Sequence, residues 1–375
     1  MDIPASVSSF LKTYKGHTPH LVVSLDKVRQ KFYALRAAMP AVLHHYAIKA
    51  NPHPDILRKV KELGGYFECA SIPEIDMCLA VGAKAEEILY GNPIKKVSEI
   101  RAAYERGIRQ YVFDAELELE KLIENAPGAQ VICRIITTGF GSVSPLSVKF
   151  GCPEDKAYAW LLRAHHNGLV AYGVSFHTGS QQLDTQAWRA PIEAAGRLFV
   201  QLKADGVDTL SVLNVGGGFP VSYRDEVPPI SAFGAAILSA VEQNFKVKLP
   251  IIYTEPGRYL AGDAGYIISE VVLISPCHKR PDHRWVYLDI GRYGGLVEEK
   301  IDYPLLNDKG GKVGPVLLAG QTCDSNDVIY AESFNYHLPL SLAPEDRVIL
   351  AHTGAYTTTY STTLNGFPAL TSQCI

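Results

Sequence analysis

The feature that most constrains this chain is a regular alternation of short strand-like runs and helical patterns between residues 42 and 255. Polar or glycine breaks separate the β-rich runs from the helical patterns. Eight strand–helix units in series predict a TIM barrel, in which eight parallel strands close into a ring. The strand-like runs are 44–49, 66–69, 88–92, 111–114, 130–137, 170–177, 210–215 and 251–255.

The pattern changes after residue 257, where strand-like runs follow one another with few helices. The runs 266–274, 285–289, 313–318 and 347–352 predict a second, smaller β domain, and the early run 21–25 is assigned to it as well. A chain of 375 residues has room for one domain of roughly 200–250 residues and a smaller one. We therefore expect an α/β barrel over residues 26–258 and a β-rich domain made of 1–25 and 259–375.

Composition excludes several classes of protein. Hydrophobic residues at 47%, charged residues at 20% and a net charge of -3 describe an ordinary globular protein with no electrostatic reason to bind nucleic acid. The seven cysteines are scattered without metal-ligand spacing, which favours reduced thiols and no metal site. The first ten residues do not resemble a signal peptide, and no apolar stretch approaches ~20 residues. We expect a cytoplasmic protein that does not enter a membrane.

Lys49 is the first candidate for catalysis, because it closes the apolar run that begins at Tyr46. A lysine that a core strand delivers into a cavity loses part of its preference for the charged form. Its neutral amine can then condense with the aldehyde of a cofactor such as pyridoxal phosphate. An ordinary strand-end lysine in water is the simpler interpretation, and the motifs downstream decide against it.

Polar residues at the C-terminal ends of the predicted strands are further candidates, because barrels place their function at that rim. The first strand ends at Lys49, and the second contains Glu68. The fifth contains Arg134, the sixth ends at His177 and the eighth ends at Glu255. One amine, two carboxylates, a guanidinium and an imidazole are therefore expected on one rim.

The segment Gly216-Gly217-Gly218 follows the seventh strand, in a region where barrels often hold phosphate. Glycines let backbone N–H groups approach an anion without side-chain obstruction. Three glycines by themselves more often mark a tight turn, but this position favours a phosphate site. Ser180 and Arg258 are candidates to complete it.

Glu255 is predicted to meet a protonated pyridine nitrogen, because a buried carboxylate needs a cationic partner. Such a pairing keeps the cofactor ring an electron sink. An ion pair with Arg258 is the alternative, and both pairings are possible in different ligand states. His177 is a candidate to stack on the ring, beside the alternative of a histidine that is merely hydrogen-bonded.

A series of short motifs covers nearly the whole chain. Each motif is weak alone, but the ordered series is very specific. By it the chain resembles the fold-type III pyridoxal-phosphate (PLP) decarboxylases, which have the alanine racemase-like fold, and within them most closely the ornithine decarboxylases. The motifs are Tyr46-Ala-Ile-Lys49-Ala-Asn51, Phe67-Glu-Cys-Ala-Ser71 with Glu74, Ser147-Val-Lys-Phe-Gly151, Ser175-Phe-His177-Thr-Gly-Ser180, Gly216-Gly-Gly-Phe-Pro220, Glu255-Pro-Gly-Arg258, Gly320-Gln-Thr-Cys323-Asp324, Gly354-Ala-Tyr356-Thr357 and Asn365-Gly-Phe367.

The resemblance implies a role for each rim residue. Lys49 would bind the cofactor through its amine, His177 would stack on the ring, and Glu255 would pair with the pyridine nitrogen. Ser180, Gly218, Arg258 and Tyr356 would hold the phosphate. The full set of implied cofactor-binding residues is Lys49, Glu68, Arg134, His177, Ser180, Gly216, Gly217, Gly218, Glu255, Pro256, Gly257, Arg258 and Tyr356.

The family builds its active site at a head-to-tail dimer interface, so the resemblance also implies an obligate homodimer. Cys323 and Asp324 would enter the partner's site, where Cys323 would donate a proton to the product carbon. A small buried hydrophobe is the usual alternative for a free cysteine, but the polar Thr-Cys-Asp context favours catalysis. In the implied reaction the substrate amine displaces Lys49, the α-carboxylate leaves as carbon dioxide, and Cys323 reprotonates the carbon.

The substrate is expected to be a small amino acid with a second ammonium group, which calls for carboxylates. Asp324 and Asp302 are the candidates, with Ile301 beside Asp302. The preferred reaction converts L-ornithine to putrescine for polyamine biosynthesis. Lysine remains open because one methylene changes binding by only ~1–3 kcal/mol. Diaminopimelate decarboxylases usually carry Cys-Glu where this chain has Cys323-Asp324, and they need a basic group for the second carboxylate.

Four residues depart from the ornithine decarboxylase pattern: Glu68 replaces the usual aspartate, Gln321 the usual proline and Leu364 a common aromatic, and Ile301 stands beside Asp302. None of them removes a chemical role. Ile301 and Leu364 bear on the choice of substrate more than on the reaction.

Other functions on the same fold stay open as alternatives. A decarboxylase of carboxynorspermidine or of a D-amino acid is the nearest one. A racemase would need a second base, and Cys323 in a Cys-Asp motif argues against it. A non-catalytic regulator resembling antizyme inhibitors would have lost cofactor binding, whereas this chain keeps Lys49, Glu255 and Cys323.

Overall fold

The computed structural model describes residues 3–246, 248–298, 300–329 and 335–375. The chain divides into two compact units. The larger unit contains Arg29–Pro220 and Val227–Tyr259, and the smaller one contains the described residues of Met1–Val28, Val221–Glu226 and Leu260–Ile375. Each unit is described separately below.

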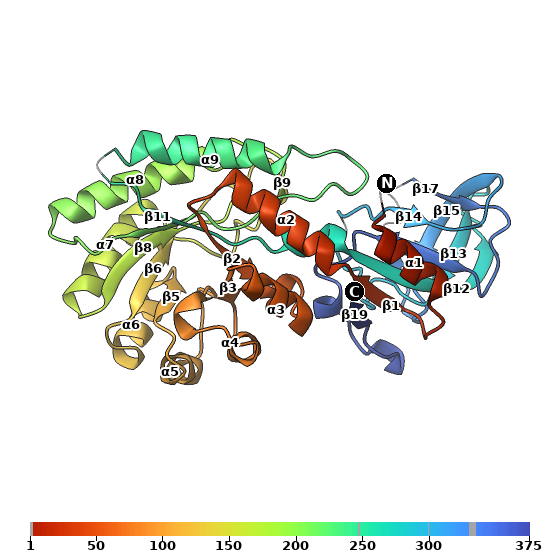
Figure 1. The fold of residues 1–375 in the computed structure, drawn as a ribbon, viewed down its shortest axis with the longest axis horizontal. Helices are drawn as coiled ribbons and strands as arrows, with labels where there is room; N and C mark the ends of the chain where they lie inside the picture. The colour runs from red at the N-terminus through yellow and green to blue at the C-terminus, as the bar shows by residue number, and fades with distance from the viewer. Residues whose placement is uncertain (1–2, 247, 299, 330–334) are drawn as a thin grey trace. The chain divides into compact units, whose positions relative to one another are not determined.

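The larger unit is a closed barrel of eight parallel strands, in the order β10-β11-β2-β3-β4-β5-β6-β8, which confirms the predicted fold class (Figure 1). Its strands are rich in apolar residues because they are covered on both faces. Buried side chains from five of them, such as Leu89, Val112 and Ile132, form one core cluster. The strands are β2 (Leu43–Ala47), β3 (Tyr66–Cys69), β4 (Ile88–Tyr90), β5 (Gln110–Phe113), β6 (Gln130–Arg134), β8 (Val170–Ser175), β10 (Val212–Asn214) and β11 (Ile251–Thr254).

The barrel strands end earlier than the sequence predicts at the rim. Strand β2 ends at Ala47, and the next residues form the 3-10 helix η1 (Ile48–Ala50), so Lys49 lies on a turn beyond the strand. Strand β6 ends at Arg134 instead of residue 137. Two further short strands, β7 (Ser142–Ser144) and β9 (Ser180–Gln182), pair antiparallel in this region and were not anticipated.

Helices cover the outside of the barrel (Figure 1). All seven helices expected between the strands are present, and α2 (Leu25–Ala38) precedes them without having been predicted. No helix within the described residues is both long and apolar enough to span a membrane. The seven are α3 (Pro54–Glu62), α4 (Ile72–Ala80), α5 (Val97–Glu105), α6 (Glu116–Asn125), α7 (Glu154–His166), α8 (Arg189–Ala204) and α9 (Ile230–Asn244).

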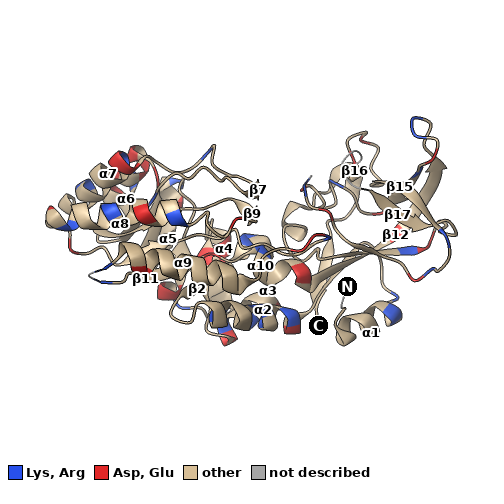
Figure 2. Cartoon of the chain, turned by 90° about the horizontal axis from the view of Figure 1, so that it is seen from above, with Lys and Arg blue, Asp and Glu red and all other residues tan. Residues whose placement is uncertain are grey.

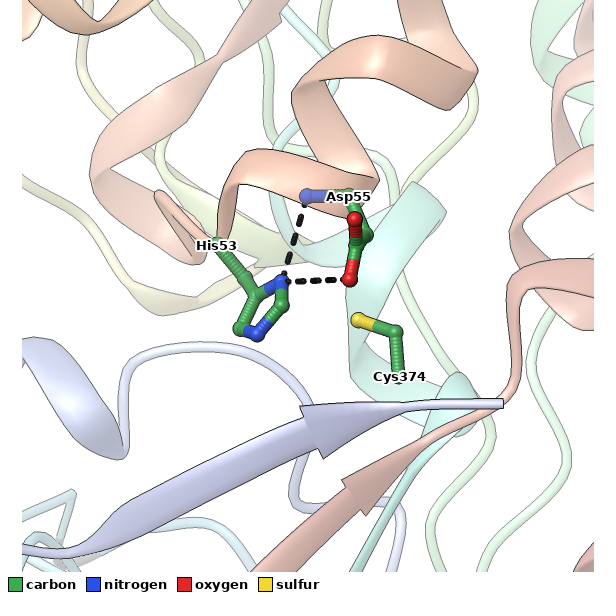
Figure 3. Close-up of side chains that lie close together, drawn as sticks. All are labelled: His53, Asp55 and Cys374. Carbon is green, nitrogen blue, oxygen red and sulfur yellow. Dashed lines mark hydrogen bonds and ion pairs between the residues drawn. The ribbon is translucent and has the colours of Figure 1, made fainter.

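Helix α3 shows how local sequence starts these helices. Pro54 occupies the first turn, where its missing N–H costs no hydrogen bond. His53 is the N-cap, and its Nδ1 accepts the backbone N–H of Asp55 at 3.2 Å (Figure 3). The Asp55 carboxylate also lies 3.7 Å from His53 Nδ1. An aromatic cap and an acidic first turn thus satisfy the positive helix end that follows Lys49.

Acidic and basic residues are interspersed over the outer helices of the barrel (Figure 2). Arg163 of α7 pairs with Glu116 and Glu120 of α6, at 2.7 and 3.0 Å. Arg197 of α8 pairs with Glu154 of α7 at 2.8 Å. These side chains are exposed, so each pair contributes at most about 1 kcal/mol to stability.

A buried ion pair ties the rim of the barrel to helix α6. Lys95 follows β4, and its fully buried ammonium lies 3.1 Å from Glu118, whose side chain is 3% exposed. The same ammonium donates to the carbonyl oxygens of Asn92 and Val112, at 2.8 and 2.7 Å. Burial lowers the pKa of Lys95 to about 8, although Glu118 opposes this shift. The carboxylate is therefore needed to keep this lysine charged.

The smaller unit is built on a nine-stranded sheet with the central order β14-β18-β12-β13-β15-β16. Strand β1 pairs antiparallel with β12 and parallel with β19, and β17 pairs with β15. A helix that was not predicted, α1 (Ala5–Thr13), precedes β1. The strands are β1 (His20–Val23), β12 (Gly265–Pro276), β13 (Arg284–Leu288), β14 (Leu305–Leu306), β15 (Val313–Ala319), β16 (Val328–Ile329), β17 (Tyr336–Pro339), β18 (Arg347–Ala351) and β19 (Thr371–Cys374).

Helix α1 is held by the core of the smaller unit. Its Val7 is fully buried against Val22, Tyr266 and Ala351, which come from β1, β12 and β18. The sequence of residues 5–13 is too short and too weakly patterned to announce a helix, because helices of this length depend on tertiary packing. The burial of one helix face thus explains why this element was missed.

Replacing Glu118 by alanine should lower the free energy of unfolding by about 3 kcal/mol, because Lys95 would then be buried without its counter-ion. Glu116→Ala is the control, since it breaks an exposed pair of the same helix and should cost less than about 1 kcal/mol. Urea unfolding of the two variants measures both values. Equal losses would show that the buried pair has no special contribution.

Candidate active site

Lys49 and Glu68 form an ion pair at the carboxyl ends of β2 and β3. Lys49 Nζ lies 3.1 Å from Glu68 Oε2, and the side chains are 47% and 3% exposed. The expectation that Lys49 is removed from water is therefore wrong, because an accessible ammonium beside a carboxylate keeps its charge. Gly91 makes room for Glu68, since a Cβ there would lie 2.3 Å from Glu68 Oε1. Glu68 is placed to accept the proton that Lys49 must lose before its amine reacts.

Glu255 follows β11 and carries the most unfavourable carboxylate of the rim. Its Oε1 accepts a hydrogen bond from Asn214 Nδ2 at 2.6 Å. Burial raises the pKa of Glu255 to about 7, and the nearby charge of Glu68 raises it further, while Lys49, Asn214 and Arg134 oppose the shift. A carboxyl group in this position gains stability from any cation that binds against it.

Asn214 is a site residue that the sequence reasoning missed. It is the last residue of β10, and its Oδ1 accepts the N–H of Gly216 at 3.0 Å while its amide donates to Glu255. One side chain thus connects the carboxylate to the glycine segment. A polar residue at the C-terminal end of a barrel strand was the available signal, and it was applied to the other strands but not to this one.

His177 lies two residues after β8 and is held as a neutral ring. Burial lowers the pKa of His177 to about 3, and the positive charges of Arg134 and Lys49 act in the same direction. Its Nδ1 accepts the backbone N–H of Gly179 at 3.0 Å. Because Nδ1 is an acceptor, the proton of the neutral ring is on Nε2. The ring is therefore an uncharged flat surface with a defined tautomer.

The glycine segment has no room for side chains. Gly216 and Gly218 have φ angles of 70° and 94°, which glycine adopts without strain. A Cβ on Gly217 would lie 2.4 Å from the carbonyl oxygen of Glu255, and one on Gly218 would lie 2.3 Å from that of Gly179. These close approaches require glycine at Gly217 and Gly218, and they leave the backbone N–H groups uncovered by side chains.

Arg258 brings a buried positive charge to the same segment. It is 5% exposed, begins the short helix α10 (Arg258–Ala261), and donates from Nη2 to Ser180 Oγ at 3.2 Å. Ser180 begins β9, and the N–H of Gln182 in this strand donates to Gly218 O at 2.9 Å. A guanidinium, a hydroxyl and the glycine backbone thus meet at one place, as an anion site requires.

Arg134 and the segment after Glu255 complete the rim. Burial lowers the pKa of Arg134, whereas the charges of Glu255, Asp114 and Glu68 raise it. The carbonyl oxygen of Pro256 accepts the N–H of Ala47 at 3.3 Å, two residues before Lys49. Gly257 separates this contact from Arg258. All predicted barrel residues therefore lie at the carboxyl ends of the strands.

The remaining candidates belong to the smaller unit. Cys323 has an exposed thiol, and Asp324 accepts a hydrogen bond from Tyr293. Ile301 is buried, with 4% of its surface exposed. Tyr356 follows β18 with a φ angle of 57°. The structure gives these residues their own surroundings within this unit.

Asp302 already has a cationic partner, which the sequence did not reveal. Its Oδ2 lies 2.9 Å from Nη1 of Arg224, and Tyr336 also donates to its carboxylate. Burial raises the pKa of Asp302, while Tyr336 and Arg224 oppose this. Its other oxygen, Oδ1, is buried and accepts no hydrogen bond from the described residues. A single arginine in a loop gives no sequence signal, because only folding brings it to Asp302.

Comparison with known proteins identifies the family. The model of the pyridoxal-binding domain of the pyridoxal-dependent decarboxylases matches residues 25–262. The lysine/ornithine decarboxylase of Selenomonas ruminantium is 34% identical over 355 residues, which cover 93% of this chain and 88% of that protein. The chain belongs to the pyridoxal-dependent decarboxylases. It is a PLP-dependent decarboxylase of basic amino acids, and hence a lyase.

Solved structures agree with this assignment. A crystal structure of SrLDC with PLP and cadaverine has a TM-score of 0.89 and 32% identity, and the match covers 100% of this chain and 94% of that one. The arginine decarboxylase of Paramecium bursaria Chlorella virus, bound to agmatine, has a TM-score of 0.91 and 26% identity, with both chains covered completely. The whole chain therefore has the fold of these decarboxylases.

The barrel rim fits PLP in three respects. The raised pKa of Glu255 marks a carboxylate that needs a cation, as a protonated pyridine nitrogen would supply. The neutral ring of His177 presents a flat surface. Arg258, Ser180 and the glycine segment provide positive charge and donors for a phosphate. The chemistry that PLP supplies when bound is an electron sink.

Gly217→Ala should weaken PLP binding by at least about tenfold, because the new methyl group would push the Glu255 carbonyl away from its place. Fluorescence titration of the cofactor-free protein with PLP measures the dissociation constant. Gly310→Ala is the control, since no atom lies within 4 Å of a Cβ added there. Unchanged affinity in Gly217→Ala would remove this residue from the binding site.

Glu255→Gln should stabilise the cofactor-free protein at pH 8 while weakening PLP binding. The folded protein holds the Glu255 proton up to about pH 7, whereas the unfolded chain releases it near the ordinary pKa of 4.5. The wild type therefore loses stability as the pH rises between these values, by on the order of 1–3 kcal/mol. Glutamine does not titrate, so its advantage should be absent at pH 4 and full at pH 8.

Urea unfolding at the two pH values, with and without PLP, measures this difference. A stability difference that is the same at both pH values would contradict the raised pKa. Glutamine keeps an oxygen for Asn214 to donate to, so the variant tests the charge and not the hydrogen bond.

Proposed function

We propose that this chain decarboxylates L-ornithine to putrescine and carbon dioxide, and that it supplies polyamine biosynthesis. The observation that carries the proposal is the state of Asp302, a carboxylate that pairs with Arg224 through one oxygen and has a second, buried oxygen without a donor. A buried acceptor of this kind favours one further cationic donor. The distal ammonium of a diamino acid has that chemistry.

The larger unit would bind the cofactor. Lys49 would bind it through its amine, after giving a proton to Glu68, and would later release it to the substrate amine. Glu255 would hold the proton of the pyridine nitrogen, and Arg134 would moderate the charge of the carboxylates around it. His177 would pack on the ring. The phosphate would be held by Ser180, Gly216, Gly217, Gly218, Pro256, Gly257, Arg258 and Tyr356.

The smaller unit would supply the proton and the specificity. Cys323, with its exposed thiol, would deliver a proton to the carbon that loses carbon dioxide. Asp302 and Asp324 would bind the distal ammonium, and Ile301 and Leu364 would set the length of the pocket. These assignments follow from the family resemblance and from the carboxylates of this unit.

We also propose a cytoplasmic homodimer with shared active sites. Cys323 is exposed in the single chain, as expected for a residue that enters a partner's site. All seven cysteines are free, including two pairs of sulfur atoms only 3.6 Å apart, Cys69 with Cys78 and Cys133 with Cys152. Thiols this close stay reduced in a reducing compartment such as the cytoplasm.

L-Lysine is the second candidate substrate. A relative that is 34% identical is named a lysine/ornithine decarboxylase. The two substrates differ by one methylene, which a hydrophobic pocket separates by only about 1–3 kcal/mol. Leu364 is smaller than an aromatic residue and leaves more space for the longer chain.

The proposal predicts that PLP-loaded protein releases putrescine and carbon dioxide from L-ornithine faster than it turns over L-lysine, their D-forms or meso-diaminopimelate. Lys49→Ala should lose the visible absorption band of lysine-bound PLP, and Cys323→Ala should keep it. Chromatography of the amines, with carbon dioxide measured in parallel, tests the order of substrates.

The outcomes separate the alternatives. Dominant turnover of lysine would keep the reaction and change the specificity. Dominant turnover of meso-diaminopimelate would assign its second carboxylate to Arg224, the basic group beside Asp302. No turnover of any substrate by protein that binds PLP would overturn the proposal and leave a larger substrate or a regulator.

A further inference from the structure

The proposed proton donor lies in a loop with a tight internal structure. Residues 320–327 connect β15 to β16, and Cys323 is near their centre. The carboxylate of Asp327 accepts from both the N–H and the hydroxyl of Thr322, at 3.1 and 2.7 Å. The N–H of Gly320 donates to the Asp327 carbonyl at 2.8 Å. These bonds fix the two sides of the loop to each other.

Asn365 connects this loop to a distant segment of the same unit. The backbone N–H of Cys323 donates to Asn365 Oδ1 at 3.1 Å, across 42 residues of sequence. Cys323 has two side-chain atoms beyond Cα, so the place of its thiol follows directly from its backbone. A bond to this N–H therefore limits where the sulfur can lie.

The conformation of Asn365 is suited to this contact. Its φ and ψ angles are 57° and 14°, a left-handed conformation that asparagine tolerates better than most residues. The turn η5 (Leu364–Gly366) is anchored on both sides, because Gly366 N–H donates to Thr363 O and Thr362 N–H donates to Tyr293 O, each at 2.9 Å. The amide of Asn365 is thus presented from a fixed turn.

The same turn carries Leu364, a residue assigned to the far end of the substrate pocket. Leu364 and Thr322 line one small cavity of about 20 Å³ together with Tyr293 and Phe367. Tyr293 also donates to Asp324, the neighbour of Cys323. The loop of the proton donor and the turn at the substrate end therefore form one connected structure.

We propose that Asn365 is a positioning residue, which holds the backbone of Cys323 and thereby aims its thiol at the product carbon. The proposal rests on the proposed function of Cys323 as proton donor. Asn365 itself does not touch the reacting atoms. Its expected effect is therefore on the accuracy of proton delivery, and its loss should change kcat and product yield more than KM.

Asn365→Gly is the decisive variant, because glycine keeps the left-handed conformation and removes only the side-chain acceptor. Asn365→Asp is the matched control, since its carboxylate can still accept from the Cys323 N–H. Hydrogen–deuterium exchange of the PLP-loaded enzyme measures protection of the Cys323 amide. Exchange should be about three- to tenfold faster in Asn365→Gly, as expected for loss of one hydrogen bond, and close to wild type in Asn365→Asp.

The second readout is the ratio of amine to carbon dioxide released from L-ornithine. Asn365→Gly should lower this ratio and leave KM within about twofold, whereas Asn365→Asp should keep both values. Asn365→Ser, whose side chain is too short to reach the Cys323 amide, replaces the glycine variant if that variant does not fold. Unchanged exchange and unchanged product ratio in the variants without the acceptor would overturn the proposal.

Cys323→Ala separates this proposal from the function on which it rests. Full amine yield from Cys323→Ala would end the proton-donor assignment, and the exchange experiment would still report whether Asn365 holds the loop. A lower yield from Cys323→Ala with an unaffected Asn365→Gly would keep the donor and reject the positioning residue. Lower yields from both, with faster exchange in Asn365→Gly, would support the two proposals together.

Discussion

The pairing of β11 with β2 is the contact on which the active-site rim depends. It consists of the neighbours Tyr253 with Leu43 and Thr254 with His44, and it joins the last barrel strand to the first across more than two hundred residues. The closed ring brings the residues that follow these strands to one edge. Glu255 and Lys49 belong to the same site only because this pairing closes the barrel.

Closing the barrel also concentrates charge in a small volume. Glu68 and Glu255 repel each other there, and burial makes the effect stronger, which is why the pKa of Glu255 reaches about 7. Lys49 and Arg134 offset part of this repulsion. The rim is thus destabilised without a cofactor, as functional sites often are, and a bound pyridinium would remove part of the strain.

The sequence was most informative where local pattern and final position agree. Eight apolar runs of strand length, separated by helical patterns, predicted the barrel, because parallel strands covered on both faces must be apolar. Residues at the ends of those runs, such as His177 and Arg258, were found by the same rule. Helix α1 and the short strands β7 and β9 were missed, because their stability comes from packing and pairing partners far away in the sequence.

Sequence alone thus determined the fold class, the family and the list of polar residues at the strand ends. Tertiary structure decided their states: it showed Lys49 to be exposed and paired with Glu68, Asp302 to be paired with Arg224, and the Cys323 backbone to be bound by Asn365. The physical reason is that residue type and spacing are local properties. Burial, charge state and hydrogen-bond partners depend on segments that only the folded chain brings together.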